Sequence, residues 1–173
     1  MTSPVSTRFT TSFWPIRALP CSTAQWTDST PPGSTFKPCT AIAALTERKI
    51  DTGTIIECEG RYTKYADIGY APKCWIYGQG LHGELTVSGA ITNSCNYFFY
   101  TVGDYLQISL MAKYARLFGL GESTGIELYE KTGVMTTDQY MQRKYGRDVA
   151  IKDLLSSSLA ERKNLLIYST FSW

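Results

Sequence analysis

Small and apolar residues follow a helical period soon after residue 33. Ile42 and Leu45 stand three positions apart, with alanines at 41, 43 and 44 around them. Residues at this spacing share one face of a helix, so the pattern predicts a buried helix over residues 31–51. Asp51 and Gly53 close it.

Beyond this helix the pattern alternates between loop-rich and helical stretches. Residues 54–80 have the composition of short strands and loops, whereas apolar residues return at helical spacing over about 86–93, 97–105 and 109–118. Gly119 ends the last of these helices, because glycine readily takes the left-handed conformation that follows a helix. The pattern predicts an α+β fold that is mainly helical.

The two ends of the chain have a different character. Residues 1–30 are crowded with Ser, Thr and Pro and show neither helical nor strand periodicity, and from about residue 154 Leu and Ser recur without turn residues. We therefore expect a folded region over residues 31–153, preceded by a disordered segment and followed by an aberrant tail over 154–173.

Length and composition indicate one globular domain. The chain has 173 residues, with 13% aromatic and 18% charged residues, enough for a sizeable core. A formal net charge of +2 gives no bulk electrostatic attraction for nucleic acid or an anionic membrane. No window approaches the apolar length of a membrane span, and residues 1–9 show no signal-peptide core.

The five cysteines show no CxxC and no Cys/His ligand spacing, so neither a metal site nor a cofactor is expected. Cys39 and Cys95 stand in apolar helical contexts and are predicted to be small buried residues. Cys58 and Cys74 flank a loop rich in Tyr and Gly. They would form a disulfide in an oxidising compartment, although two free thiols are the favoured prediction.

Candidate chemistry begins at the start of the first helix. Pro32-Gly33 supplies a turn, and Pro38 is tolerated only in a first helical turn, which places the helix start at Ser34. Three residues make nearly one turn, so Ser34 Oγ and Lys37 Nζ point the same way, and a partly desolvated lysine can take a serine proton. The alternative for Ser34 is a simple helix N-cap.

A second polar group lies at a break between two predicted helices. Ser94 and Asn96 flank Cys95 there, and by themselves such residues most often end one helix and cap the next. A hydroxyl can also relay a proton, and an amide can orient the lysine and bind a peptide. The order Ser-x-x-Lys followed by Ser-x-Asn favours the catalytic interpretation.

With these motifs the run from residue 32 to about residue 153 resembles the transpeptidase domain of a penicillin-binding protein of the monofunctional class B type. The matching segments are Pro32-Gly33-Ser34-Thr35-Phe36-Lys37-Pro38, Ala41-Ile42-Ala43-Ala44-Leu45, Lys73-Cys74-Trp75, His82-Gly83, Ser94-Cys95-Asn96, Phe98-Phe99-Tyr100, Phe118-Gly119-Leu120-Gly121 and Thr124-Gly125-Ile126. The resemblance implies the β-lactamase/transpeptidase-like fold, here mainly its helical half with an incomplete central antiparallel sheet.

The resemblance also implies roles for individual residues. Ser34 would be the nucleophile acylated by a peptidoglycan stem peptide or a β-lactam, Lys37 its base, Ser94 the proton relay, and Asn96 an anchor for substrate and lysine. His82, the only histidine, would be structural. The substrates would be stem peptides and β-lactams, with no nucleic acid. The parent protein would be membrane-anchored with this domain outside the cytoplasmic membrane, beside a glycosyltransferase of the cell-wall machinery.

The chain departs from the family at the third motif, a Lys-Thr/Ser-Gly on the edge strand of the sheet. Lys131-Thr132-Gly133 has the right letters but follows directly on a surface-loop segment, so we reject it. A shifted reading frame over residues 11–33 permits a family-like approach to the nucleophile, which is why the ends are expected to be out of frame. The resulting expectation is a truncated D,D-transpeptidase that is inactive as this chain. The alternatives are a β-lactam sensor domain or, less favoured, a serine β-lactamase.

Overall fold

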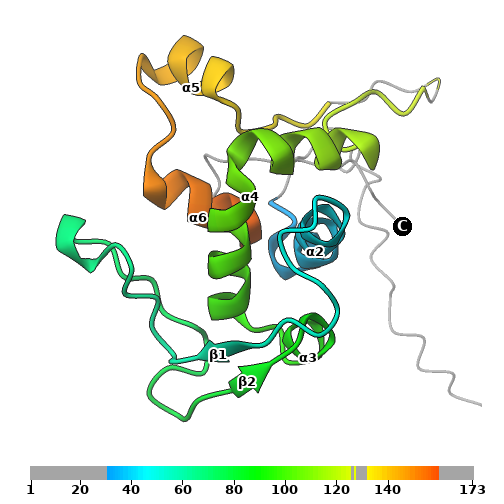
Figure 1. Cartoon of the computed structure of the whole chain (residues 1–173). Helices are drawn as coiled ribbons and strands as arrows, with labels where there is room; N and C mark the ends of the chain where they lie inside the picture. Colours follow the sequence, from blue (N-terminus) through cyan, green and yellow to red (C-terminus); the bar gives the residue numbers. More distant parts are fainter. Residues whose placement is uncertain (1–30, 126, 128–131, 160–173) are drawn as a thin grey trace, which may run out of the picture.

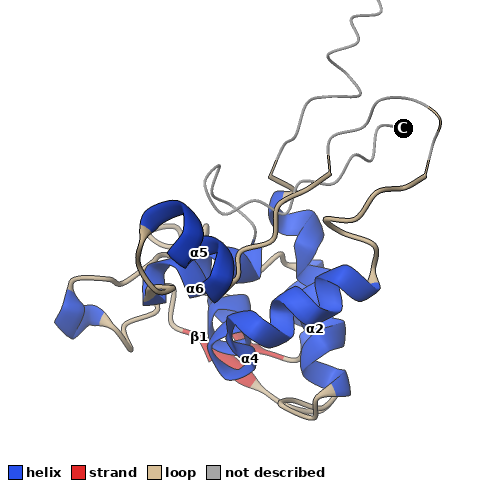
Figure 2. Ribbon diagram, turned by 90° about the horizontal axis from the view of Figure 1, so that it is seen from above, coloured by secondary structure: helices blue, strands red, loops and turns tan. Residues whose placement is uncertain are grey.

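The computed structural model describes residues 31–125, 127 and 132–159. Its helices gather around one long helix, α4 (Asn96–Leu117), with α2 (Lys37–Thr46) and α6 (Ile151–Leu159) packed against it. A two-stranded sheet lies at one end of α4 (Figures 1 and 2). The predicted class, mainly helical with little sheet, is confirmed.

The first helix begins as predicted but ends earlier. A 3-10 turn, η1 (Gly33–Phe36), runs directly into α2, whose first turn holds Pro38. The helix ends at Thr46 rather than at residue 51 because Arg48 takes a left-handed conformation (φ 53°). The amide of Lys49 then bonds the carbonyl of Ala44 at 2.9 Å, in the manner of a Schellman cap.

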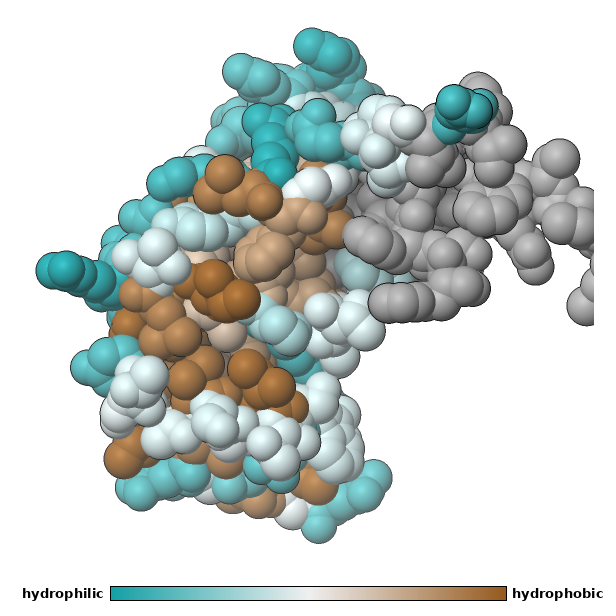
Figure 3. Space-filling view, turned by 90° about the vertical axis from the view of Figure 1, so that its right-hand side faces the viewer, coloured by the Kyte–Doolittle hydropathy of each residue, from teal (hydrophilic) through white to brown (hydrophobic). Residues whose placement is uncertain are grey.

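The prediction that Ile42 lies on the buried face of this helix is wrong. Ile42 is 44% exposed, whereas Ala43 and Ala44 are fully buried. The helix turns its small residues toward α4, which lets the two backbones approach closely. Figure 3 shows the molecule from the right-hand side of Figure 1, where α2 lies. Apolar residues gather on the surface that faces the viewer there.

The next helices follow the sequence pattern closely. α3 (Val87–Thr92) is capped by Thr86, whose side chain accepts a hydrogen bond from the amide of Gly89. α4 covers the two predicted helices over 97–105 and 109–118, and it breaks between them at Gln107 (φ 61°, ψ 164°). Figure 1 shows the second arm turning away from the first and passing over α2. Lys113 and Tyr114 of this arm both donate to Glu47 Oε1 at 2.9 Å, just past the end of α2.

The segment between α2 and α3 is mostly loop, as predicted. β1 (Ile56–Cys58) pairs antiparallel with β2 (Gly83–Leu85), so that Cys58 lies opposite Gly83. Between the strands stand a short 3-10 turn, η2 (Ala66–Ile68), and a single bridge from Arg61 to Lys73. Two three-residue strands make too little sheet for independent stability, so this segment depends on other contacts.

Two helices were missed by the sequence analysis. α5 (Asp138–Tyr145) follows the cap residue Thr137, and α6 packs along α4. The predicted boundary after residue 153 falls inside α6, whose buried residues continue to Leu159 because they face α4 and α2. Residues 1–30 and 160–173, the rest of the two predicted ends, lie outside the described residues.

The close packing of α4 on α6 depends on Gly103. A Cβ built on Gly103 would lie 2.5 Å from Ser158 Cβ and 3.8 Å from Ser158 Cα. We therefore expect Gly103→Ala to destabilise the fold by about 1–3 kcal/mol, despite the better helix propensity of alanine. Thermal unfolding should show a fall of about 2–4 °C per kcal/mol.

The control for this prediction is Gly53→Ala, since Gly53 lies in a loop, lacks a positive φ, and its added Cβ meets only Asp51 at 3.5 Å. An equal or higher melting temperature for Gly103→Ala than for Gly53→Ala would contradict the proposed clash.

A buried carboxylate ties the loop after β1 to α4. Asp104 is 5% exposed and accepts hydrogen bonds from Tyr62, Tyr65 and Lys64. Burial by itself raises the pKa of Asp104, but the bonds from Lys64, Tyr65 and Tyr62 outweigh it and lower that pKa. The carboxylate therefore stabilises the fold above its unfolded-state pKa of about 3.9, and this contribution is lost as the pH falls through the lower folded-state value.

We expect Asp104→Asn to be less stable than the parent chain at pH 6 and to lose less stability than the parent between pH 5 and pH 2. Denaturant unfolding at a series of pH values measures both. Asp51→Asn is a matched control, since Asp51 is exposed and bonds only its own loop. Parallel pH profiles for the parent and Asp104→Asn would show that this carboxylate is not held ionised by its partners.

Candidate functional site

Ser34 and Lys37 lie one turn apart at the point where η1 becomes α2. Ser34 is exposed, whereas Lys37 is 2% exposed. The turn exists because Gly33 takes a positive φ (60°) that other residues rarely adopt, and Pro38 begins the helix proper. An accessible hydroxyl and a desolvated amine therefore lie one turn apart.

Ser94 and Asn96 occupy the sharp turn between α3 and α4. Ser94 has a left-handed backbone (φ 48°), an uncommon state for serine. This conformation directs both its carbonyl and its hydroxyl to Lys37 Nζ, at 2.7 and 2.8 Å. Asn96 Oδ1 accepts a third bond from Lys37 Nζ at 2.7 Å. The structure thus brings the second predicted motif onto the first.

The remaining link joins the two serines. Ser94 Oγ lies 3.2 Å from Ser34 Oγ, so a continuous chain of hydrogen bonds runs from Ser34 through Ser94 to Lys37. A hydroxyl can both donate and accept, so a proton can move along this chain in either direction. The ring of Phe99 lies 5.7 Å from Lys37 Nζ and covers the ammonium from the core side.

The third motif has no counterpart among the described residues. Thr132 and Gly133 lie in a loop, and the strands of the described region are β1 and β2. Lys131 lies outside the described residues. The rejection of Lys131-Thr132-Gly133 stays a prediction.

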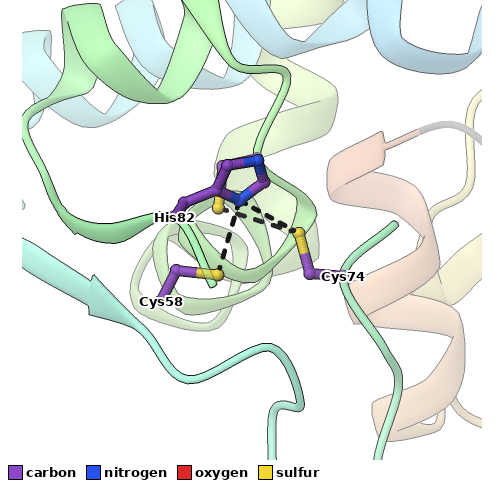
Figure 4. A group of neighbouring side chains, drawn as sticks. Cys58, Cys74 and His82 are labelled. Atoms are coloured by element: carbon purple, nitrogen blue, oxygen red, sulfur yellow. Dashed lines mark hydrogen bonds between the residues drawn. The ribbon is translucent and has the colours of Figure 1, made fainter. Parts of the chain in front are cut away.

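A second cluster of reactive side chains lies beside the Ser94 turn. The ligand atoms of Cys58, Cys74, His82 and Cys95 all lie within 4.8 Å of one another. His82 Nδ1 is 3.6 Å from both Cys58 Sγ and Cys74 Sγ, and Cys74 Sγ is 3.9 Å from Cys95 Sγ. Figure 4 shows His82 pointing its ring between the sulfurs of Cys58 and Cys74, which come from separate segments.

The sequence spacing gives no ligand arrangement for these cysteines, whereas the structure places three of them beside His82. They are free thiols in the structure, and the Cys58–Cys74 disulfide is not formed. Spacing alone could not reveal the group, because its members are 16, 8 and 13 positions apart in the sequence (58 to 74, 74 to 82, 82 to 95). The signal that could have revealed the group is the number of Cys and His residues in and next to a polar loop segment that has no core of its own.

The groups of this cluster differ in how readily they ionise. Burial is the largest effect on His82 and lowers its pKa, with the positive charge of Lys37 adding to the shift, so the imidazole is neutral. Burial raises the pKa of Cys74, but backbone amides of Tyr97, Ile76 and Asn96 bond its sulfur and lower that pKa overall. Burial raises the pKa of Cys95. Cys74 is the first of these two thiols to ionise.

Comparison with known proteins gives a consistent picture. The sequence profile of the Penicillin binding protein transpeptidase domain matches residues 5–157, which takes in part of the segment 1–30. Stage V sporulation protein D of Bacillus subtilis is 38% identical over 107 residues, 60% of this chain and 16% of that protein. The peptidoglycan D,D-transpeptidase MrdA of Haemophilus influenzae is 29% identical over 142 residues, 76% of this chain and 20% of that protein.

Solved structures share the fold. PBP2 of Pseudomonas aeruginosa, in complex with WCK 5153, superposes with a TM-score of 0.73 at 20% identity, over 81% of this chain and 31% of that one. PBP2 of Helicobacter pylori, solved with MreC, gives 0.69 at 24% identity, over 79% and 24%. A chain of a peptidoglycan synthase complex that coordinates polymerization and crosslinking gives 0.71 at 28% identity, over 84% and 24%.

Two further facts bound these similarities. The chain spans a fifth or less of the length of the two curated relatives, at 16% and 20%. Among the described helices, none has the length and apolar character needed to cross a bilayer.

Proposed function

The chain belongs to the penicillin-binding protein transpeptidase domain family, and we propose that Ser34 is the acyl-accepting nucleophile of a D,D-transpeptidase site that cross-links peptidoglycan. The observation that carries the proposal is the hydrogen-bond chain from Ser34 through Ser94 to Lys37, closed by Asn96. Residues about 60 positions apart converge on one lysine, whereas simple helix caps would bond only their own helices.

The chemistry follows from these contacts. Ser34 Oγ attacks the carbonyl carbon of the penultimate D-alanine, and its proton passes through Ser94 Oγ to Lys37 in the neutral amine form. The C–N bond to the terminal D-alanine then breaks, and the same proton returns through Ser94 to the departing amine. An acceptor amine reverses these steps: it attacks the ester, gives up a proton toward Lys37, and frees the Ser34 hydroxyl.

Asn96 and the strained turn hold this arrangement in register. The amide oxygen of Asn96 accepts from Lys37, and its N–H₂ is the type of group that donates to a peptide carbonyl. The substrates proposed are stem peptides and, as their mimics, β-lactams. For the parent protein we propose membrane anchoring with the domain outside the cytoplasmic membrane, next to a glycosyltransferase. The synthase complex that this fold resembles supports that partner.

Acylation of this chain is expected to be slow, and cross-linking is not expected. In this family the oxyanion formed when the serine attacks is held by the backbone N–H of the nucleophile, here Ser34, and by one N–H from a strand. Among the described residues no strand supplies that second donor, and the loss of one such donor typically costs about 10²–10³ in rate. We propose that the functional domain extends through α6 to Leu159 and that residues 160–173 lie outside it.

The test is covalent labelling of the full chain with a fluorescent penicillin, read by intact mass. We expect one adduct that is absent in Ser34→Ala and retained in Thr35→Ala, a neighbouring exposed hydroxyl. An adduct of equal yield in Ser34→Ala, or no adduct at saturating drug, would overturn the assignment of Ser34.

The fate of the adduct separates the related functions. A stable ester that releases D-alanine from a stem peptide supports the transpeptidase, whereas a stable ester without any reaction with the peptide supports the sensor domain. Rapid release of hydrolysed drug would identify a serine β-lactamase.

A further inference from the structure

We propose that Arg61, Lys73, Tyr77 and Leu81, together called the Tyr77 patch, bind an internal carboxylate of the stem peptide, outside the D-alanines that react. The identity of the peptide rests on the proposed function. The preference for an anion that adjoins apolar groups stands on the contacts of the patch alone.

Two cations lie opposite each other in the segment between β1 and β2. Arg61 and Lys73 are the partners of an antiparallel bridge, and residues paired in this way project to the same face. Figure 1 shows the two arms of this segment side by side. Like charges in opposite positions repel, and no ion pair within the described residues includes either cation. An anion bound between them removes this repulsion.

The ring of Tyr77 holds both cations close together. Lys73 Nζ lies 4.7 Å from the ring centroid, and Arg61 Cζ lies 5.7 Å from it. Cation–π attraction keeps the two groups from moving apart, while both side chains stay exposed to solvent. Arg61 Nε also donates to the carbonyl of Ala71 at 3.3 Å. This bond uses one of five N–H groups, so the terminal nitrogens can take a carboxylate in the usual bidentate way.

The position of the ring is fixed by the backbone below it. Gly60 has a positive φ of 77°, and a Cβ built there would lie 3.0 Å from Leu81 Cδ2 and 3.1 Å from Tyr77 Cδ2. Both side chains therefore lie directly over Gly60. The amide of Cys74 donates to the carbonyl of Gly60 at 2.8 Å, and the amide of Tyr77 donates to the carbonyl of Cys74 at 3.0 Å. A site that is already ordered loses little entropy when it binds.

The surroundings of the two cations favour a carboxylate on a peptide over a bare anion. Leu81 is 64% exposed and Tyr77 is 42% exposed, so apolar surface adjoins the charges. A stem peptide carries free carboxylates and the methyl groups of its alanines on one short chain, whereas phosphate has no apolar group to cover Leu81. A formal net charge of only +2 also gives the chain no general attraction for polyanions or anionic membranes.

The loop that carries the patch is attached to the turn that carries Ser94. Trp75 Nε1 donates to the carbonyl of Asn93 at 3.1 Å. Asn93 directly precedes Ser94, whose hydroxyl lies 3.2 Å from Ser34 Oγ. Tyr77 follows Trp75 by two residues, which span at most about 7 Å. Contacts to a part of the substrate that does not react can position the part that does, and this is the role assigned to the patch.

The test is the binding of two stem peptides to the full chain carrying Ser34→Ala, in which no ester can form at residue 34. One peptide has its internal carboxylates free, the other has them amidated, and both keep the terminal carboxylate. We expect the free form to bind about tenfold more tightly at low salt, as charge-assisted hydrogen bonds require. The difference should shrink at about 1 M NaCl, which screens exposed charges. The amide resonances of residues 73–81 should shift with the free form only.

Substitutions locate the effect on the protein. Arg61→Gln and Lys73→Gln should each weaken binding of the free form about threefold to tenfold and leave the amidated form nearly unchanged. Lys49→Gln, which changes an exposed lysine just beyond α2, should alter neither affinity. The comparison of the two peptides needs no substitution in the patch, so it decides the proposal even where a patch variant fails to fold.

Equal affinity for the two peptides would overturn the site, as would a loss in Lys49→Gln as large as that in Lys73→Gln. Displacement of the free peptide by an equal concentration of inorganic phosphate would assign the patch to phosphate and not to the peptide. If the parent chain labels at Ser34 with penicillin while both peptides bind equally, the patch fails and the proposed function stands. If Ser34 never labels but the free peptide binds more tightly, the patch stands and the assignment of Ser34 fails.

Discussion

Replacing Lys37 with methionine is expected to lower the rate of Ser34 acylation by about 10²–10⁴, the usual contribution of a positioned general base. Methionine fills much of the volume of the lysine stem but accepts no proton. It also leaves the acceptors on Ser94 and Asn96 without their shared donor, and each buried acceptor left unpaired costs about 1–3 kcal/mol. The variant should therefore lose both reactivity and stability, measured by labelling rate and by denaturant unfolding.

Two controls separate these effects. Lys49→Met changes an exposed lysine just beyond α2 and should alter neither quantity. Lys37→Arg retains a cation but cannot give up a proton, so it should remain as unreactive as the methionine variant. Labelling of Lys37→Arg at the parent rate would show that Lys37 acts by charge alone and not as a base.

Phe99→Ala should produce the largest loss of stability, about 3–5 kcal/mol, because it removes a fully buried aromatic ring from the centre of the core. The ring also packs on Phe98, with centroids 5.5 Å apart, and covers Lys37 Nζ at 5.7 Å. Total stabilities are only about 5–15 kcal/mol, so this loss is a large fraction of the free energy of unfolding. Denaturant unfolding followed by circular dichroism measures it.

Phe99→Leu separates packing from the aromatic contact. Leucine restores much of the apolar volume, so stability should recover by several kcal/mol, while the contact between ring and ammonium stays lost. Phe118→Ala, which removes a half-exposed ring, should cost far less. If Phe99→Ala and Phe118→Ala are equally destabilising, the core does not centre on the first arm of α4.

Much of the helical part could be predicted because its signals are local. Thr86 caps α3 and glycines follow the end of α4, and even the break near Gln107 lies between the two predicted helices. The exposure of Ile42 could not be predicted. The period of apolar residues indicates that a helix has a buried face, but not which element packs against it. α5 had readable signals, with Thr137 before it and Gly146 after it, but α6 is defined by its burial against α4.

The candidate site could likewise be predicted only in part. Ser34, Lys37, Ser94 and Asn96 were predicted from two short motifs whose order implies a shared site, and the structure brings them within hydrogen-bonding distance. The cysteine and histidine cluster could not be predicted by spacing, since it forms only when a polar segment with very short strands folds back on the start of α4. Contacts between residues that are far apart in the sequence produce no periodic pattern in it.

The break at Gln107 determines how firmly α2 is located. A straight helix of the length of α4 would extend about 33 Å, whereas α2 is about 15 Å long. Such a helix would therefore contact α2 only through its own first turns. With the break, one arm holds Lys37 at the beginning of α2, and the other holds Glu47 just past its end. α4 therefore contacts α2 at both of its ends. These contacts prevent α2 from shifting along its axis. The position of Ser34, one turn before α2, is therefore fixed as well.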